Sequence, residues 1–106
     1  HRQLHKTFPH KPEFAQLFTG DDKRAARESF AFRNGSLQGA YLIMAARAIG
    51  LDCGPMSGFD NAMVDQIFFG GGSVKSNFLC ALGYGDSAKV MERLPRLAFG
   101  EVCQLL

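Results

Sequence analysis

Apolar residues recur at helical spacing along one long proline-free stretch, from Arg24 to Ile49. One apolar stripe along this stretch consists of Phe30, Leu37, Tyr41, Met44 and Ala48. A second consists of Leu42, Ile43, Ala45, Ala46 and Ile49. The pattern predicts a helix whose later half is apolar nearly all round. Asp21 and Asp22 are positioned to cap its start, and Gly50 to end it.

This helix is too long for a chain of 106 residues to cover alone. At about 1.5 Å per residue it extends nearly 40 Å, whereas a compact 100-residue domain has a radius of gyration of about 13 Å. We therefore expect a partner surface outside this sequence. Gly35 and Gly39, one turn apart, permit close approach of another backbone, either within one subunit or between subunits.

Shorter elements flank the helix. Residues 1–20 are loop-like, with one or two helical turns around an apolar patch of Phe14, Leu17 and Phe18. Residues 50–60 are dense in glycine and proline and predict a loop. A short helix is expected over Asn61–Phe69, capped by Asp60 and ended by three glycines from Gly70. Its buried side should comprise Ala62, Val64, Ile67 and Phe68.

The last third of the chain combines strand and helix signals. The apolar run at residues 78–82 predicts an interior strand buried on both faces. A last short helix is expected from Ser87 to Arg93, ended by Pro95, before an amphipathic tail from Leu97 to Leu106. The chain is thus expected to be α+β, with one long central helix and a buried strand.

Charge and composition narrow the function classes. Twelve basic and ten acidic residues leave a net charge of +2, which gives no electrostatic basis for binding nucleic acid or an anionic membrane. Cys53, Cys80 and Cys103 form neither a disulfide framework nor a zinc ribbon, so we expect a reducing, cytoplasmic setting. No apolar stretch approaches the length of a membrane span, and no signal peptide is visible. The start at His1 rather than Met indicates truncation or processing.

The sequence does not support a serine nucleophile, a metal site or a catalytic cysteine. Ser57 superficially fits a serine elbow, but Pro55 stands where that turn needs glycine, and all histidines lie in the first ten residues. The spacing of His1 and His5 would suit a helical metal site, but no third ligand is apparent, so we predict no metal centre. The cysteines are expected to be ordinary buried or half-buried thiols.

A second possible motif is a dinucleotide-binding fingerprint near the end of the chain. Gly83-Tyr84-Gly85-Asp86-Ser87-Ala88 matches G-x-G-x-x-A between a predicted strand and a possible helix. A complete unit needs a second strand, and here the chain is nearly finished. A glycine turn that leaves a buried strand is the stronger interpretation, and a dinucleotide-binding module stays open as an alternative.

Several blocks of sequence resemble the carboxy-terminal half of the malonic semialdehyde reductases, a group within the nitroreductase family. The matching blocks are Phe32-Arg33-Asn34, Gln38, residues 40–43, Gly50-Leu51-Asp52, Gly54-Pro55-Met56-Ser57-Gly58-Phe59-Asp60, Lys75-Ser76-Asn77, Gly83-Tyr84-Gly85-Asp86-Ser87 and Arg93-Leu94-Pro95-Arg96. Before Phe32 the match thins to Phe8-Pro9-His10 and scattered positions. Residues 1–106 would then be the carboxy-terminal part of one nitroreductase-like domain.

The resemblance implies an FMN enzyme with an α/β/α sandwich, a homodimer that binds flavin at the subunit interface. In such relatives, the segment equivalent to Pro55, Met56, Ser57 and Gly58 lies against the isoalloxazine ring, with backbone N–H groups near N5 and O4. Many nitroreductases have glutamate at the position of Ser57, so any role of that glutamate side chain does not carry over. Because flavin supplies the hydride chemistry, we expect no catalytic side chain in this segment.

Basic residues near the carboxy terminus complete the cofactor site that the resemblance implies. Arg93 matches the family's phosphate-binding arginine by position, and Arg96 is expected to be surface. The lysine often found two residues before that arginine is Met91 here. Lys89, four residues before Arg93, would share a helical face with it and act as a substitute.

Two functions from different classes follow. The first is an FMN-dependent NAD(P)H oxidoreductase that reduces malonic semialdehyde to 3-hydroxypropionate, or acts as a nitroreductase. The second is a non-catalytic dimerising fragment that lacks flavin. The resemblance favours the enzyme, acting on a small-molecule substrate as a homodimer, with neither nucleic acid nor membrane as a partner.

Overall fold

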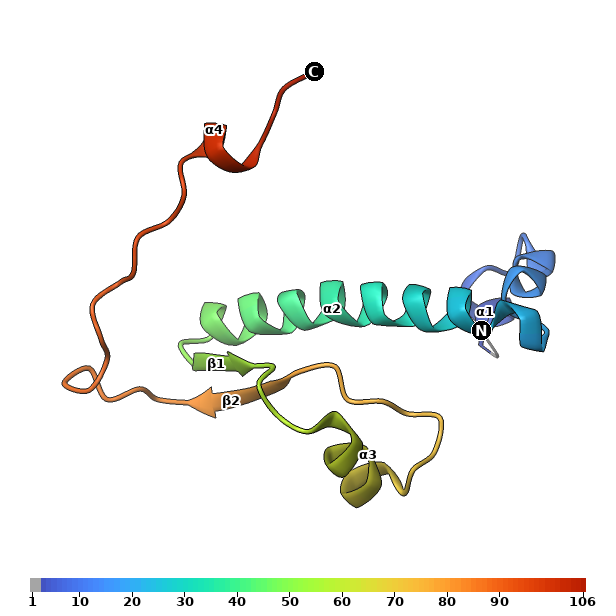
Figure 1. Ribbon diagram of the computed structural model, residues 1–106, viewed down its shortest axis with the longest axis horizontal. Coiled ribbons are helices and arrows are strands. Elements are labelled where there is room, and N and C mark those ends of the chain that lie inside the picture. Colours follow the sequence, from blue (N-terminus) through green and yellow to red (C-terminus); the bar gives the residue numbers. More distant parts are fainter. Residues whose placement is uncertain (1–2) are drawn as a thin grey trace.

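The computed structural model describes residues 3–106 and combines helices with one pair of strands (Figure 1). The elements, in chain order, are α1 (Leu4–Thr7), η1 (Pro12–Phe18), η2 (Asp21–Lys23), α2 (Arg24–Ala48), β1 (Asp52–Met56), α3 (Asn61–Phe69), β2 (Leu79–Gly83) and α4 (Phe99–Val102). The expected mixture of helix and strand is confirmed. The helical turns expected near Phe18 are also present, as η1.

The long helix is confirmed, but its predicted cap is wrong. α2 runs for 25 residues, and Gly50 follows it with a φ of +88°, a left-handed conformation that glycine adopts without strain. Asp21 and Asp22 lie in η2, and no side chain caps α2. The reason is that η2 runs directly into α2, so that the carbonyl of Asp21 already accepts the N–H of Arg24.

The glycine-rich stretch after α2 contains a strand, where the sequence predicted only a loop. β1 pairs antiparallel with β2, from Asp52 opposite Gly83 to Met56 opposite Leu79. Pairing with a distant segment supplies the hydrogen bonds that this local composition does not predict. β2 begins one residue later than expected. Its burial on both faces is wrong for this chain, because each strand has one neighbour and Leu82 is half exposed.

The segment just before β2 packs against α2 at the two predicted glycines. A methyl group at Gly39 would overlap the ring of Phe78, and one at Gly35 would lie 3.4 Å from the amide nitrogen of Asn77. That amide also donates to the hydroxyl of Ser36 over 3.0 Å. Tight packing at both glycines therefore occurs within this chain, and side chains rather than another backbone make the contact.

The ends of α3 were predicted correctly, but its buried side was not. The Asp60 carboxylate accepts the N–H of Met63 over 3.0 Å, and Gly70 ends the helix with a φ of +58°. The buried residue of α3 is Asp65, whereas Ile67 and Phe68 are 66% and 73% exposed and Ala62 is also exposed. Of the predicted side, only Val64 is half-buried. The polar side of α3 faces inward because it holds the segment before β2.

The helix expected over residues 87–93 does not form. A turn closes where Lys89 N–H donates to Asp86 O over 2.9 Å, and the chain then runs irregularly to α4. A helix of seven residues is unstable without a surface to pack on, and none of the residues from Tyr84 to Leu106 is even half-buried. Within the expected amphipathic tail, only α4 is helical.

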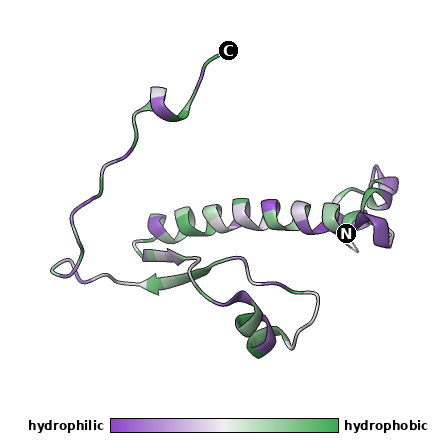
Figure 2. Ribbon diagram, in the orientation of Figure 1, coloured by the Kyte–Doolittle hydropathy of each residue, from purple (hydrophilic) through white to green (hydrophobic). Residues whose placement is uncertain are grey.

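The molecule is open and exposes most of its apolar side chains. Its radius of gyration is 18.4 Å, well above the roughly 13 Å of a compact domain of 100 residues. Phe18 and Ala46 are the buried apolar side chains of residues 3–106. Figure 2 shows apolar residues along α2 and α3, and on α2 Tyr41 and Ile49 are 73% and 76% exposed. α2 therefore presents the excess apolar surface that its sequence predicts.

Candidate cofactor site

The predicted flavin segment lies where β1 ends. Pro55 and Met56 form the last two positions of the strand, and Ser57 and Gly58 follow it, all exposed. Within residues 3–106, the N–H groups of Ser57 and Gly58 have no hydrogen-bond acceptor. A methyl group built on Gly58 would meet nothing within 4 Å. The segment thus offers two free donors on an open backbone, held in place by the adjacent cap at Asp60.

The two predicted phosphate-binding residues lie on the irregular segment after β2. Arg93 is exposed, and its side chain makes no hydrogen bond or ion pair within the described chain. The Lys89 ammonium lies 3.8 Å from the Asp86 carboxylate. Because the helix over residues 87–93 is absent, the prediction that Lys89 and Arg93 share a helical face is wrong. Arg93 is the freer cation, and Lys89 stands beside a carboxylate that would repel a phosphate.

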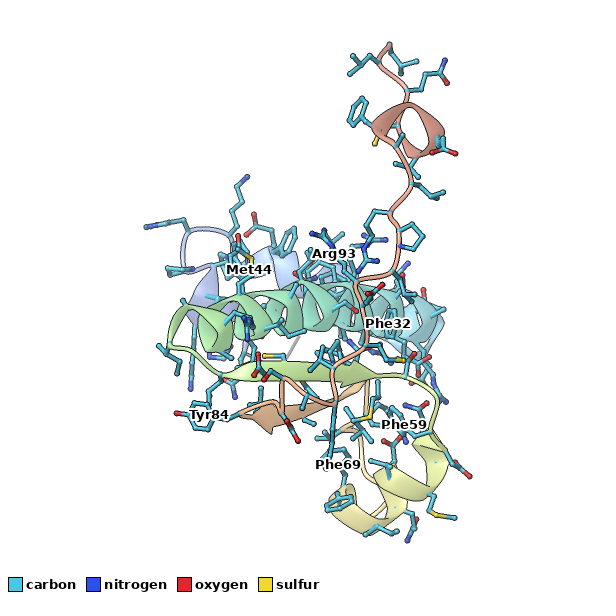
Figure 3. The ribbon with its side chains drawn as sticks, turned by 90° about the vertical axis from the view of Figure 1, so that its left-hand side faces the viewer. Phe32, Met44, Phe59, Phe69, Tyr84 and Arg93 are labelled. Atoms are coloured by element: carbon cyan, nitrogen blue, oxygen red, sulfur yellow. The ribbon has the colours of Figure 1, made fainter. Side chains whose placement is uncertain are left out.

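These two parts of the predicted site are not brought together within one chain. Since β1 and β2 are antiparallel, the chain leaves β2 at Gly83, opposite Asp52 and away from Met56. Ser57 and Gly58 therefore lie at one end of the strand pair, and the segment that carries Arg93 departs from the other. Figure 3 shows Arg93 and Phe59, the residue after Gly58, on different sides of the strand pair.

A carboxylate that the sequence did not single out fixes the turn after β2. Asp52 accepts the N–H of Gly85 over 2.7 Å and pairs with the guanidinium of Arg47, which also donates to the carbonyl of Leu51 over 3.0 Å. The Gly85 N–H, followed by the charge of Arg47, lowers the pKa of Asp52. A methyl group on Gly85 would lie 3.0 Å from the carboxylate. A side chain at this position would crowd the contact.

The same turn weakens the dinucleotide alternative. A fingerprint of this type opens a helix whose N-terminus receives the phosphates, and a second strand follows. In the described chain, residues 86–89 form an isolated turn, and no strand follows β2. Gly83-Tyr84-Gly85 acts as a structural turn, which the hydrogen bond from Gly85 to Asp52 holds in place. The side chain of Tyr84, in the middle of this turn, is 85% exposed (Figure 3).

A second carboxylate, Asp65, fixes the segment that enters β2. It accepts the backbone N–H of Ser76 over 2.6 Å and lies 3.4 Å from the ammonium of Lys75. The bond from Ser76 N–H is the main cause that lowers the pKa of Asp65. The Asn61 amide donates to the carbonyl and hydroxyl of Ser76 over 3.0 and 2.8 Å. Asp65 thus holds together α3 and the approach to β2.

Both carboxylates were missed because each acts on a residue distant in sequence. Asp52 and Gly85 are 33 positions apart, and Asp65 and Ser76 are 11 apart. A signal was present, since Gly50-Leu51-Asp52, Gly83-Tyr84-Gly85 and Lys75-Ser76-Asn77 all belong to the blocks of resemblance. The contact between Asp52 and Gly85 joins two of these blocks, and Ser76 in the third block contacts Asp65.

The other candidate chemistries find little support. Among residues 3–106, no three metal-ligating side chains gather, and His1 lies outside the described residues. Cys53 and Cys80 are half-buried and Cys103 is exposed. No helix in the described chain is both long and apolar enough to cross a membrane.

Comparison with known proteins identifies relatives along nearly the entire chain. The chain is 59% identical over 103 residues to a Ralstonia pickettii protein named "Putative NADH dehydrogenase/NAD(P)H nitroreductase HadB", covering 97% of this chain and 53% of that protein. A Stenotrophomonas maltophilia protein of the same general name is 57% identical over 105 residues, covering 99% of this chain and 52% of its own length. This chain is a homologue of these nitroreductases.

The resemblance to the nitroreductase family is thereby confirmed, but it covers only part of each relative. The chain spans about half the length of the relatives it matches. No protein-family model matches the chain. The shared name describes the relatives as NAD(P)H oxidoreductases.

Proposed function

We propose that this chain forms the carboxy-terminal part of an FMN-dependent NAD(P)H oxidoreductase. The observation that carries the proposal is the 59% identity to a nitroreductase-named relative over 97% of the chain. The rest of the protein would complete an α/β/α sandwich of nitroreductase type, acting as a cytoplasmic homodimer.

The residues present fit one edge of a flavin. The unpaired N–H groups of Ser57 and Gly58 can donate to acceptor atoms of the ring system, and the absence of a side chain at Gly58 lets a flat ligand approach. The unpaired guanidinium of Arg93 suits a phosphate, which it can bind through two parallel hydrogen bonds. Lys89 is the weaker candidate because Asp86 already pairs with it.

The separation of these two parts explains why the site must be completed from elsewhere. A flavin that contacts Ser57 and Gly58 in this arrangement would reach Arg93 only from a second copy, or after the tail has packed. An interface site in a homodimer meets this requirement. Bound FMN would supply the hydride-transfer chemistry, and this chain would bind and orient it.

The substrate we propose is malonic semialdehyde, reduced to 3-hydroxypropionate, with nitro compounds and quinones as further acceptors. The support is the resemblance around Gly54-Pro55-Met56-Ser57-Gly58-Phe59-Asp60. The substrate carboxylate needs a cation or N–H donors, and the Gly54–Asp60 segment itself carries no cationic side chain. That group would come from the other half of the protein or from a second subunit.

The cofactor is tested by visible absorbance of the purified full-length protein and by release of its chromophore with acid. We expect the flavin spectrum and free FMN rather than FAD. A protein that stays colourless after incubation with FMN would instead support a dimerising fragment without flavin.

The substrate is tested by comparing kcat/KM for malonic semialdehyde, a nitroaromatic and a quinone on one FMN-loaded preparation. We expect malonic semialdehyde to be the best acceptor with NADH or NADPH as the donor. If it is the poorest, the assignment to this branch is wrong, while the broader flavin reductase proposal stands.

A further inference from the structure

Two cysteines from different strands lie on the same face of the β1–β2 pair. Cys53 is opposite Leu82, and Cys80 is opposite Pro55, so the two thiols form a diagonal pair offset by two residues. Side chains alternate between the faces of a strand, and residues two positions apart share a face. Cys53 and Cys80 therefore point to the same side, although 27 positions of sequence separate them.

That face is the one covered by α2. The sulfur of Cys53 lies 3.8 Å from the carbonyl of Ile43 on α2. Phe78, two residues before Cys80, has its ring against Gly39 of the same helix. Both thiols are half-buried beneath the helix. Burial, and next the proximity of the Cys80 thiol, raises the pKa of Cys53.

The ladder geometry decides what such a pair can form. Diagonal neighbours across antiparallel strands have Cα atoms about 7–8 Å apart. A disulfide needs Cα atoms about 4.4–6.8 Å apart, which is shorter than this usual diagonal spacing. Two thiolates that share a metal ion are joined by bonds of about 2.3 Å each, which lets the sulfurs stand about 4.6 Å apart. The diagonal spacing suits a bridging cation better than a direct sulfur–sulfur bond.

We propose that Cys53 and Cys80 form a two-thiolate site for a soft monovalent cation of the Cu(I) type. Thiolates are the ligands that select Cu(I) in proteins. Harder divalent ions require more ligands, and residues 3–106 hold no group of three metal-ligating side chains. This site is separate from the proposed flavin contacts and does not depend on the proposed reductase activity.

Binding would release one proton from each thiol and form two sulfur–copper bonds, without a change of oxidation state. The product carries one negative charge, as two thiolates outweigh one Cu(I). Burial raises the pKa of Cys53 overall, and the charge of the Arg47 guanidinium offsets part of that rise. An open cavity of about 600 Å³ reaches Cys53 and is lined by Arg47, Asp52, Cys53, Gly85, Ser87 and Val90. A bound ion would fasten β1 to β2 below the Pro55–Gly58 segment.

The experiment is an anaerobic titration of the full-length protein with Cu(I) in competition with a chromogenic chelator. We compare the wild type with Cys53→Ser, Cys80→Ser and, as the matched control, Cys103→Ser on the exposed tail. Loss of either ligand should weaken binding by about 100-fold or more, because chelation becomes attachment through one thiolate. Cys103→Ser should bind as the wild type does. Equal affinity in all three variants overturns the proposal.

A second measurement uses the wild-type protein, so its result does not depend on whether the variants fold. The wild-type protein is alkylated with N-ethylmaleimide, with and without one equivalent of Cu(I), and the labelled cysteines are located by mass spectrometry. Protection of Cys53 and Cys80 together, with Cys103 still labelled, is the expected result. Protection of one strand cysteine alone, or ready formation of a Cys53–Cys80 disulfide with a mild thiol oxidant, would contradict the inferred geometry.

Discussion

Asp65 illustrates at the residue scale how one buried carboxylate organises this chain. It is 7% exposed and receives the Ser76 N–H and the Lys75 ammonium, so its charged form is stabilised in the folded state. Its pKa is lowered on folding. The stabilisation is therefore present above the ordinary carboxyl pKa of about 3.9 and is lost as the pH falls through the lower folded value.

We expect Asp65→Asn to flatten the acid dependence of stability. The asparagine oxygen can still accept the Ser76 N–H, but it carries no charge to lose. The free energy of unfolding, measured by denaturant titration between neutral pH and pH 3, should fall less steeply with acid than in the wild type. The control is Asp21→Asn, an exposed carboxylate whose side chain makes no hydrogen bond within residues 3–106. An unchanged slope in Asp65→Asn would contradict the assigned role.

Gly39 and Gly35 form a matched pair for testing the packing of α2 on the strands. Gly39→Ala would place a methyl group in the Phe78 ring, whereas Gly35→Ala meets only the Asn77 amide at 3.4 Å. Overpacking costs about 1–3 kcal/mol, and replacing a helical glycine by alanine returns nearly 1 kcal/mol. We expect Gly39→Ala to destabilise the protein by up to about 2 kcal/mol and Gly35→Ala to be neutral or stabilising. Thermal denaturation of both variants tests this, and equal melting temperatures would contradict the packing.

Arg93 and Met91 test the proposed phosphate contact from opposite directions. Arg93→Ala should weaken FMN affinity while leaving turnover at saturating FMN mostly intact, because a cation at the phosphate acts on binding. Met91→Lys introduces the lysine that is common at this position in the family, and it should strengthen FMN affinity. Arg96→Ala is the control. Fluorescence titration of the apoprotein with FMN measures all three, and unchanged affinity in Arg93→Ala would return that residue to the solvated surface.

At the scale of elements, local signals were sufficient where an element depends on its own sequence. α2, the Asp60 cap and the Gly70 end of α3 follow from spacing and capping chemistry that act within a few residues. β1 was missed because its formation depends on β2, and its composition of glycine and proline argues for a loop. The helix over residues 87–93 was predicted from local pattern alone and fails because nothing covers it.

The candidate site shows the same difference between residues that local sequence identifies and contacts that only the fold creates. The Pro55–Gly58 segment and Arg93 could be named from the sequence by resemblance, and their assignment to FMN stays a prediction. The contacts of Asp52 and Asp65 could not be named, because each joins residues that only the fold brings together. Periodicity assigned the buried side of α3 to Ile67 and Phe68, while the structure buries the polar partner of Ser76 instead.

The turn after β2 gives a test at the element scale. Asp52→Ala removes the acceptor of the Gly85 N–H and the partner of Arg47. We expect the Gly85 amide to exchange faster with solvent, while amides in the middle of α2 keep their protection. Asp52→Asn keeps an acceptor, so the exchange rate of its Gly85 amide should lie between those of the wild type and Asp52→Ala. Amide hydrogen exchange followed by NMR measures the effect, and equal protection of Gly85 in all three proteins would show that the turn holds without Asp52.

At the scale of the whole molecule, the open shape and the exposed apolar surface call for a cover. Leu37, Tyr41 and Met44 on α2 are 58%, 73% and 67% exposed, and Figure 1 shows this helix standing clear of the carboxy-terminal tail. Specific interfaces commonly bury about 1,200–2,000 Å², which is within reach of a helix nearly 40 Å long. Either a second copy or polypeptide outside residues 1–106 could supply the cover.

We predict that a second copy covers this surface, so that the full-length protein is a homodimer with α2 at its contact. Tyr41→Arg should then give a monomer by light scattering, because an isologous contact would place the new charge in the interface on both subunits. Leu97→Arg, an equally drastic change at an exposed residue of the tail, should leave the dimer intact. A wild-type protein that is a stable monomer contradicts the prediction. A Tyr41→Arg variant that stays dimeric but melts at a lower temperature also contradicts it, since Tyr41 would then be covered by the same subunit.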